Sequence, residues 1–202
     1  MHAAMNFEDL TKKYADVDPF LLKKWERIFT LFFDRNCSHE IDWGDFYLCL
    51  KKVREVYGAE SVQTSYARKS MEALWKGLQE IATTGSSELI TIADWIDLLK
   101  KVDYKNRTEP KWFDDYSDFM FKLFDVSGDG VLDMAEYTDG MSVYGFGYKE
   151  CHEAFEKFAK DQNGNPITKI PPKLWEKYFL DLFFSSEHNA LGNNLFGVMD
   201  VN

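Results

Sequence analysis

A run of twelve residues, Asp125 to Glu136, carries oxygen-bearing side chains at a regular spacing. Oxygens occupy positions 1, 3, 5 and 9 of the run, a glycine occupies position 6 and a glutamate position 12. Ca²⁺ is a hard cation that takes about six to eight oxygen ligands in flexible geometry, so its site needs oxygens that converge from one tight loop. The spacing is that of a helix–loop–helix calcium site. We expect the ligands to be Asp125, Ser127, Asp129, Val131, Asp133 and Glu136.

The six ligands of this loop would act in different ways. Val131 supplies its backbone carbonyl, Asp133 acts through a water and Glu136 binds with both oxygens, while the other three residues supply one side-chain oxygen each. Gly130 lies where the loop turns sharply into a conformation that a Cβ disfavours. A solvated acidic turn is the alternative, but the full match between two amphipathic segments favours a metal site.

A second run, Asp34 to Asp45, repeats the oxygens at positions 1, 3, 5 and 9. Its expected ligands are Asp34, Asn36, Ser38, Glu40, Asp42 and Asp45. His39 replaces the turn glycine and must accept a positive φ, at a cost of about 1–2 kcal/mol. Asp45 replaces the closing glutamate and is one methylene shorter. We therefore expect a weaker calcium site at which Mg²⁺ competes, because Mg²⁺ prefers a smaller and nearly octahedral ligand set.

Two further loops keep the length of such a site without its ligands. In residues 83–94, Thr83 and Gly85 stand at positions 1 and 3. In a loop at about residues 160–171, position 12 is Pro171 or Pro172 in either of two registers, and proline has no side-chain oxygen. We expect no calcium in either loop, and so two bound Ca²⁺ in all.

Apolar residues recur every three to four positions on both sides of each loop, which predicts helices. The predicted helical segments are residues 19–33, 46–53, 71–81, 95–102, 112–124, 137–144, 155–158 and 174–183. Position 8 of each loop is β-branched or leucine, and we expect these residues to pair as short ladders: Ile41, Ile90, Leu132 and Ile167. A good helix cap follows each of them: Asp42, Thr91, Asp133 and Thr168.

These elements predict an all-α fold of four EF-hand helix–loop–helix units in two paired lobes. Residues 1–102 form the N-terminal pair, with loops 34–45 and 83–94. Residues 103–190 form the C-terminal pair, with loops 125–136 and about 160–171. A tail, residues 191–202, follows the last helix, and its glycines and asparagines favour irregular turns. We expect Leu195 and Phe196 to fill a gap between the lobes.

Composition limits the classes of partner. The chain has 202 residues, a net charge of −10 and a pI near 4.9, and no basic stripe, which excludes nucleic acid as a natural ligand. Its three cysteines are odd in number and lack metal-binding spacing, so we expect free thiols in a reducing compartment. No apolar signal core opens the chain and no apolar run has membrane-spanning length. We expect a soluble, cytoplasmic monomer.

Several aromatic and glycine-rich features give the chain a family resemblance. These are Trp43 near the end of the first loop, the run Trp175-x-x-Tyr178-Phe179, and Gly192-Asn-Asn194-Leu195-Phe196-Gly197. Together with the four units, they resemble the calexcitin and sarcoplasmic calcium-binding protein family. The resemblance implies a compact two-lobed protein of calcium signalling or buffering in excitable or contractile cells. The second loop departs from the family, whose members often keep ligands there, so the number of sites does not carry over.

Three functional classes compete. An enzyme is disfavoured, because there is no phosphate-binding loop and no H-E-x-x-H motif. Cys151 and His152 are adjacent in a helix, and adjacent helical residues do not face each other. The favoured function is calcium-dependent signalling, in which calcium binding exposes a groove for a protein target. The alternatives are a calcium buffer without a target, which suits a chain with seven Met and abundant aromatic residues, and a photoprotein or luciferin-binding relative with a cavity ligand.

Overall fold

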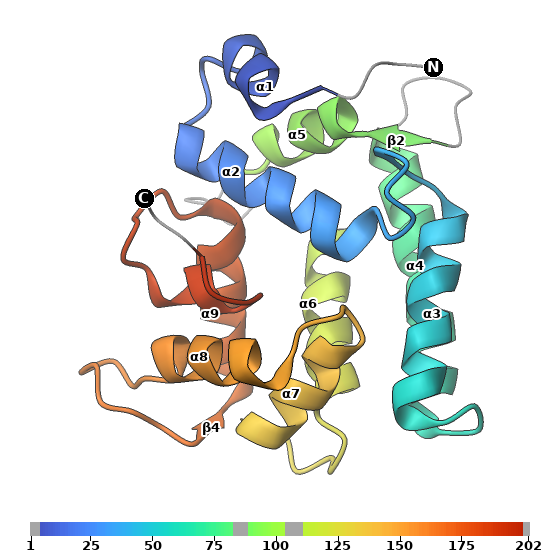
Figure 1. Cartoon of the computed structure of the whole chain (residues 1–202), viewed down its shortest axis with the longest axis vertical. Helices are drawn as coiled ribbons and strands as arrows, with labels where there is room; N and C mark the ends of the chain where they lie inside the picture. The colour runs from blue at the N-terminus through green and yellow to red at the C-terminus, as the bar shows by residue number, and fades with distance from the viewer. Residues whose placement is uncertain (1–4, 83–88, 104–110, 200–202) are drawn as a thin grey trace.

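Helices make up most of the chain, as the sequence predicts. The computed structural model describes residues 5–82, 89–103 and 111–199, and Figure 1 shows the order of its elements. The helices are α1 (Phe7–Lys13), α2 (Pro19–Ile28), η1 (Phe29–Phe33), α3 (Trp43–Tyr57), α4 (Val62–Ala82), α5 (Ile92–Lys100), α6 (Lys111–Phe124), α7 (Met134–Ser142), α8 (Tyr148–Phe158), α9 (Pro172–Phe184) and η2 (Leu191–Asn194). The strands are β1 (Glu40–Ile41), β2 (Ile90–Thr91), β3 (Leu132–Asp133) and β4 (Lys169–Ile170). Within the described ranges, no helix is both long and apolar enough to cross a membrane.

The helices that leave the first three loops begin at the predicted caps. Asp42, Thr91 and Asp133 each accept a hydrogen bond from a backbone N–H in the first turn of the helix that follows. The acidic residue three positions on accepts a hydrogen bond from the N–H of the cap itself. This reciprocal arrangement is a capping box, and it satisfies N–H groups that the helix would otherwise leave unpaired.

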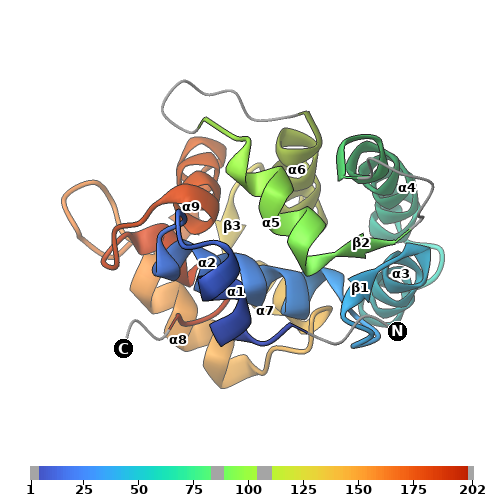
Figure 2. The same cartoon turned by 90° about the horizontal axis from the view of Figure 1, so that it is seen from above.

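Short antiparallel ladders join the loops in pairs. β1 pairs with β2, with Ile41 opposite Ile90, and Figure 2 shows these strands side by side next to α3 and α5. β3 pairs with β4, with Leu132 opposite Ile170. Three of the four predicted ladder residues are therefore confirmed, and the fourth is Ile170 rather than Ile167.

The register of the fourth loop differs because that loop is longer. Nine residues separate α6 from α7, whereas thirteen separate α8 from α9. The additional length folds back on itself, since the N–H of Ile167 donates to the carbonyl of Ala159 at 2.9 Å. The prediction of Thr168 as a helix cap is accordingly wrong: α9 begins at Pro172 and its cap position is Pro171.

The apolar faces of both halves meet in one continuous core. α4 packs on α6, and α2 packs on both α5 and α9. At the centre, the buried indole of Trp95 donates a hydrogen bond to the carbonyl of Trp25 at 3.0 Å. Its ring also lies 5.9 Å from that of Trp112. Residues of α2, α5 and α6 therefore contact one another directly in this core.

The C-terminal tail, residues 191–199 of which are described, lies in this core. Leu195 and Phe196 are 0% and 2% exposed. The ring of Phe196 stacks on Phe32 of the N-terminal half at 4.2 Å and meets Phe179 of the C-terminal half edge-on at 5.8 Å. The hydroxyl of Tyr137 donates to the carbonyl of Leu195 at 2.9 Å. The tail thus contacts both halves at once.

Candidate metal centres

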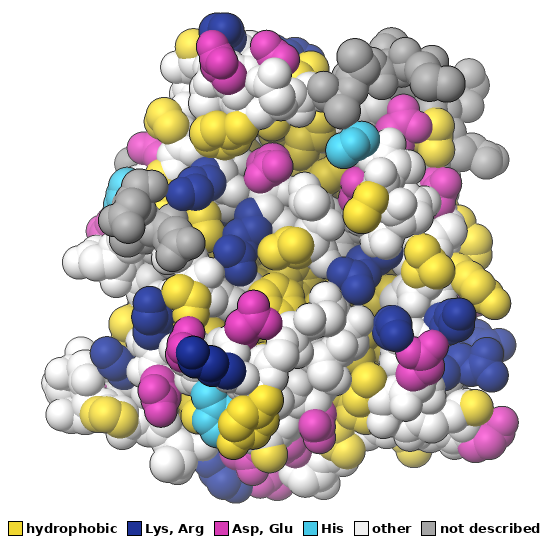
Figure 3. All heavy atoms as spheres, viewed as in Figure 1, with side chains coloured by type: hydrophobic (Ala, Val, Ile, Leu, Met, Phe, Trp, Pro, Cys, Tyr) yellow, Lys and Arg dark blue, Asp and Glu magenta, His cyan; other side chains and the backbone are white. Residues whose placement is uncertain are grey.

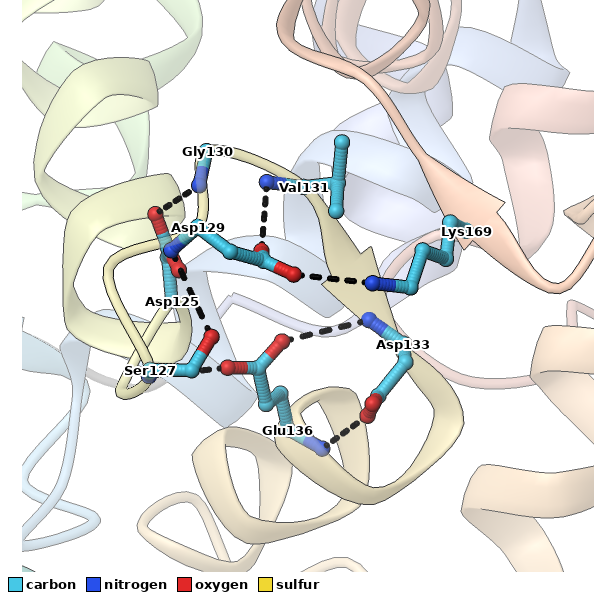
Figure 4. Close-up of polar contacts among 8 residues, drawn as sticks. All are labelled: Asp125, Ser127, Asp129, Gly130, Val131, Asp133, Glu136 and Lys169. Carbon is cyan, nitrogen blue, oxygen red and sulfur yellow. Dashed lines mark hydrogen bonds and ion pairs between the residues drawn. The ribbon is translucent and has the colours of Figure 1, made fainter.

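The third loop brings three carboxylates together. One oxygen from each of Asp125, Asp129 and Glu136 can be chosen so that all lie within 4.8 Å of one another. In the described part of the chain, this is the single group of three or more His, Cys, Asp or Glu side chains that could hold a metal ion. Figure 4 shows these side chains converging from the loop and from the first turn of α7. Their separation suits one cation shared among them.

Backbone N–H groups of the loop hold these carboxylates in place (Figure 4). The N–H of Ser127 donates to Glu136 Oε1 at 3.0 Å, and the N–H of Asp133 donates to Oε2 at 3.3 Å. Both oxygens of the closing glutamate therefore accept hydrogen bonds from backbone N–H groups across the loop. Gly130 has φ +80° and its N–H donates to Asp125 Oδ2 at 3.1 Å.

Asp125 has an oxygen that the protein leaves without a partner. Its Oδ1 is buried and has no hydrogen bond from any described residue. Leaving a carboxylate oxygen unpaired in a low dielectric is costly, and a bound cation would remove that cost. The other predicted metal-ligating atoms of the loop are also oxygens, the ligand type that Ca²⁺ prefers. The residues present therefore fit this ion.

The remaining predicted ligands of the third loop lie around this group. Ser127 is exposed, and its Oγ accepts from the N–H of Asp129 at 3.4 Å. Val131 donates its N–H to Asp129 Oδ1 at 3.1 Å. Asp133 lies outside the converging three and caps α7, which agrees with a ligand that acts through water.

The first loop closes in the same way with a shorter residue. Asp45 Oδ1 accepts from the N–H of Asn36 at 3.0 Å, and Oδ2 accepts from the N–H of Asp42 at 2.9 Å. These are loop positions 3 and 9, the same two positions that hold Glu136. Asp34 and Asp45 are only 2% and 1% exposed. Burial raises the pKa of the Asp45 carboxyl, and the charges of Asp42 and Asp34 add to this effect.

The carboxylates of the first loop do not converge as those of the third loop do. Asp34, Asp42 and Asp45 form no group of three within metal-binding distance of one another. The hydroxyl of Ser38 donates to the carbonyl of Glu40 at 2.8 Å, so two expected ligands bind each other. Asp34 accepts hydrogen bonds from the N–H groups of Ser38 and His39. The polar groups of this loop are therefore engaged with one another and with the backbone rather than gathered at one point.

Two residues of the first loop that are not glycine have a strained backbone. His39 has φ +67°, as its place in the loop predicts, and Cys37 has φ +58°. Cys37 stands at position 4, where the third loop has Gly128 with φ +69°. The sequence analysis missed this second strained residue, although comparison with Gly128 could have found it. Each costs about 1–2 kcal/mol relative to glycine.

A π-helical turn leads into the first loop, and the sequence analysis missed it as well. The N–H of Asp34 donates to the carbonyl of Phe29, five residues earlier, at 2.8 Å. The corresponding N–H of Asp125 donates to Phe121, four residues earlier, at 2.9 Å. π-turns are rare and often occur at functional sites. Here the wider turn precedes an Asp34 that is buried, whereas Asp125 is half-buried.

The fourth loop folds around one of its own carboxylates, and only part of the second loop is described. Thr83 and Gly85 lie outside the described residues. In the fourth loop, Asp161 Oδ1 accepts from the N–H groups of Asn163 at 2.8 Å and Asn165 at 2.9 Å. These bonds lower the pKa of the Asp161 carboxyl, together with one from the Asn165 side chain, which is the largest cause. The carboxylate therefore organises its own turn.

Comparison with known proteins gives the family. No family model matches the chain. The chain is 61% identical over 198 residues to Calexcitin-1 of Caenorhabditis elegans, covering 98% of this chain and 96% of that protein. It is 26% identical over 186 residues to the sarcoplasmic calcium-binding proteins I, III and IV of Branchiostoma lanceolatum, covering 90% of this chain and 98% of those proteins.

The solved structure of a sarcoplasmic calcium-binding protein from amphioxus matches the fold with a TM-score of 0.70 at 19% identity, over 91% of this chain and 100% of that one. The high identity to Calexcitin-1 over nearly the full length of both chains shows that this chain belongs to the calexcitin family of EF-hand proteins.

Proposed function

We propose that the chain binds two Ca²⁺ ions, one at Asp125–Glu136 and one at Asp34–Asp45, and acts in calcium-dependent signalling in the cytoplasm. The observation that carries the proposal is the converging group of Asp125, Asp129 and Glu136, in which Asp125 Oδ1 is buried and unpaired. The names of the relatives, which are calexcitin and calcium-binding proteins, support the choice of ion. We propose the six residues of each loop named above as the ligands.

The third loop connects its ligands to the C-terminal tail. Glu136 is in the first turn of α7, so a cation held by Asp125 and Glu136 would link the end of α6 to α7. The next residue, Tyr137, donates its hydroxyl to the carbonyl of Leu195. A shift of α7 on metal binding would reach the tail through this hydrogen bond. In a signalling protein, the apolar surface under the tail would then become the surface that meets a protein target.

Calcium buffering without a target is the second candidate. The continuous aromatic core favours it, because Phe196 is packed against both halves and holds them together. Binding of a hydrophobic dye to the full chain separates the candidates. Signalling requires an increase in dye fluorescence on calcium addition, whereas a buffer gives none.

The aromatic-lined cavity beside Tyr116 offers little room for a ligand of the photoprotein kind. The aromatic-lined cavity beside Tyr116, Cys49 and Phe119 has a volume of about 20 Å³. That is room for about one water molecule, whereas small-molecule sites measure about 300–1,000 Å³. This argues for metal binding without an organic ligand at this place.

We propose a binding role rather than a catalytic one. Cys49 and Cys151 are buried, and burial raises the pKa of each thiol to about 11. Both thiols are therefore protonated near neutral pH and are poor nucleophiles. Acidic and basic side chains are interspersed over the face in Figure 3, which offers no continuous basic area to a nucleic acid.

Paired variants test the assignment of the two sites. Glu136→Gln should abolish the tighter calcium event and leave the weaker one, because it removes half of a bidentate ligand. Asp45→Asn should do the reverse. Calorimetric titration of each metal-free variant measures both events, and circular dichroism checks that the fold is kept. The assignment fails if either variant, correctly folded, titrates as the unmodified protein does.

A further inference from the structure

The fourth loop places a positive charge on a ligand of the third. Lys169 Nζ donates to Asp129 Oδ2 at 2.8 Å, as Figure 4 shows. The other oxygen of Asp129 accepts from the N–H of Val131. Both oxygens of this predicted ligand therefore accept hydrogen bonds from within the protein. The hydrogen bond from Lys169 is also the largest cause of the lowered pKa of Asp129.

The ladder between the two loops fixes Lys169 in this place. Asp133 is directly opposite Lys169 in the pairing of β3 with β4. The lysine backbone is thus tied to a residue that is itself a predicted ligand. The length of the fourth loop decides this position. If Ile167 were the ladder residue, Lys169 would lie beyond the ladder, in the segment that leads to α9. The extra length of residues 159–171 brings this side chain to the metal loop instead.

The ammonium changes the charge of the third loop. The loop carries four carboxylates, from Asp125, Asp129, Asp133 and Glu136. The hydrogen bond to Asp129 is the largest cause of the raised pKa of Lys169, and the charges of Asp129, Asp133 and Glu136 add to it. In the metal-free loop the lysine offsets part of the repulsion among these groups. A divalent cation among the same oxygens would instead be repelled by it, because the two positive charges would lie close together.

We propose that Lys169 regulates the third loop from the fourth, lowering its affinity for cations by a fixed positive charge beside Asp129; the proposal rests on the proposed calcium site at Asp125–Glu136. A loop that has lost its own ligands thereby sets the calcium concentration at which its partner fills. The effect is electrostatic, so it grows with the charge of the bound cation and weakens with ionic strength.

The test compares Lys169→Met with the unmodified chain, using Ca²⁺ and Tb³⁺ as probes of the full-length metal-free protein. The event that Glu136→Gln abolishes identifies the third loop. Lys169→Met should tighten Ca²⁺ binding at that event by about three- to tenfold in low salt. The repulsion from Lys169 is proportional to the charge of the cation, which is 3 for Tb³⁺ and 2 for Ca²⁺. The fold-change in Tb³⁺ affinity should therefore equal the fold-change in Ca²⁺ affinity raised to a power of about 1.5. High salt should shrink both factors.

Two matched variants separate this charge from other causes. Lys169→Arg keeps the charge and should bind as the unmodified protein does. Lys173→Met removes an equal charge from an exposed position in the first turn of α9 and should change the affinity far less. The proposal is overturned if Lys169→Met leaves calcium affinity unchanged or weakens it, or if Lys173→Met has an equal effect. If Glu136→Gln abolishes no event in the unmodified background, the calcium site itself has failed, and this is seen before Lys169 is tested.

Discussion

The buried ammonium of Lys24, in α2, donates a hydrogen bond of 2.9 Å to Asn193 Oδ1 in the C-terminal tail. The same ammonium donates to the carbonyls of Asp181 at 2.8 Å and Ser185 at 2.6 Å, at the end of α9. Asn193 in turn donates its amide to the carbonyl of Glu187. Lys24 is 1% exposed, so its three donors are matched by three protein acceptors in place of water. This lysine joins the N-terminal half, the last helix and the tail.

Lys24→Met should destabilise the protein by about 2–4 kcal/mol, because it leaves Asn193 Oδ1 buried without a donor and removes the ammonium from the carbonyls of Asp181 and Ser185. The Asp181 carbonyl keeps the N–H of Ser185 at 3.1 Å. Urea unfolding of the metal-free protein measures the change. Lys149→Met, at an 89% exposed side chain on α8, is the matched control and should change stability by less than about 0.5 kcal/mol. Equal stability of Lys24→Met and the unmodified chain would show that the network contributes nothing net.

The contribution of Lys24 should depend on pH. Burial lowers its pKa to about 7, against the opposing charges of Asp181 and Asp18, whereas an unfolded lysine has a pKa near 10.5. Between these two values the unfolded chain binds more protons than the folded one, so the stability from this group rises with pH. The difference in unfolding free energy between the unmodified chain and Lys24→Met should therefore grow by about 1 kcal/mol per pH unit from pH 7.5 to 8.5. A difference that stays flat or shrinks over this range would contradict the lowered pKa.

The closing residues Asp45 and Glu136 allow a reciprocal exchange. Each accepts backbone hydrogen bonds from loop positions 3 and 9, yet Asp45 is one methylene shorter than Glu136 and almost fully buried. Asp45→Glu should raise the ratio of calcium to magnesium affinity at the first loop, because the longer side chain permits the larger ligand set that Ca²⁺ prefers. Glu136→Asp should lower the ratio at the third loop. Competition titrations measure both ratios, and if neither ratio moves, position 12 does not set the selectivity.

Residue spacing in the sequence predicts those features that depend on residues close together in the chain. Helix caps depend on residues three positions apart, as at Asp42, Thr91 and Asp133. Loops of standard length place the ladder pair Ile41–Ile90 and bring Asp125 close to Glu136. In the fourth loop the predicted ladder residue, Ile167, is three positions before the observed one, Ile170. The reason is that Asp161 folds the extra length of this loop into a turn of its own, and spacing within one sequence does not show which residues pair across two loops. Lys24 and Lys169 act through partners 169 and 40 residues away, Asn193 and Asp129. Such contacts exist only once the chain has folded.

Truncation after Ala190 should uncover an apolar surface. Leu195 and Phe196 are almost fully buried against both halves, and burying two such side chains contributes about 3–6 kcal/mol before the entropy of ordering the segment. The truncated chain should lose thermal stability and bind a hydrophobic dye more strongly when calcium is present. Phe196→Leu, which keeps an apolar side chain, is the milder control and should change both properties less. Unchanged dye binding and melting temperature would rule out a covering role for the tail.

The most direct test of the two-site account is the calcium stoichiometry of the unmodified, metal-free chain. Isothermal titration calorimetry should give two Ca²⁺ per chain in two separable events. The tighter event belongs to Asp125–Glu136, where the carboxylates already converge, and the weaker one to Asp34–Asp45, where Mg²⁺ competes. Magnesium should therefore suppress the weaker event first. A stoichiometry of one would remove the first-loop site, and three or four would show that the loops at residues 83–94 or 159–171 bind calcium after all.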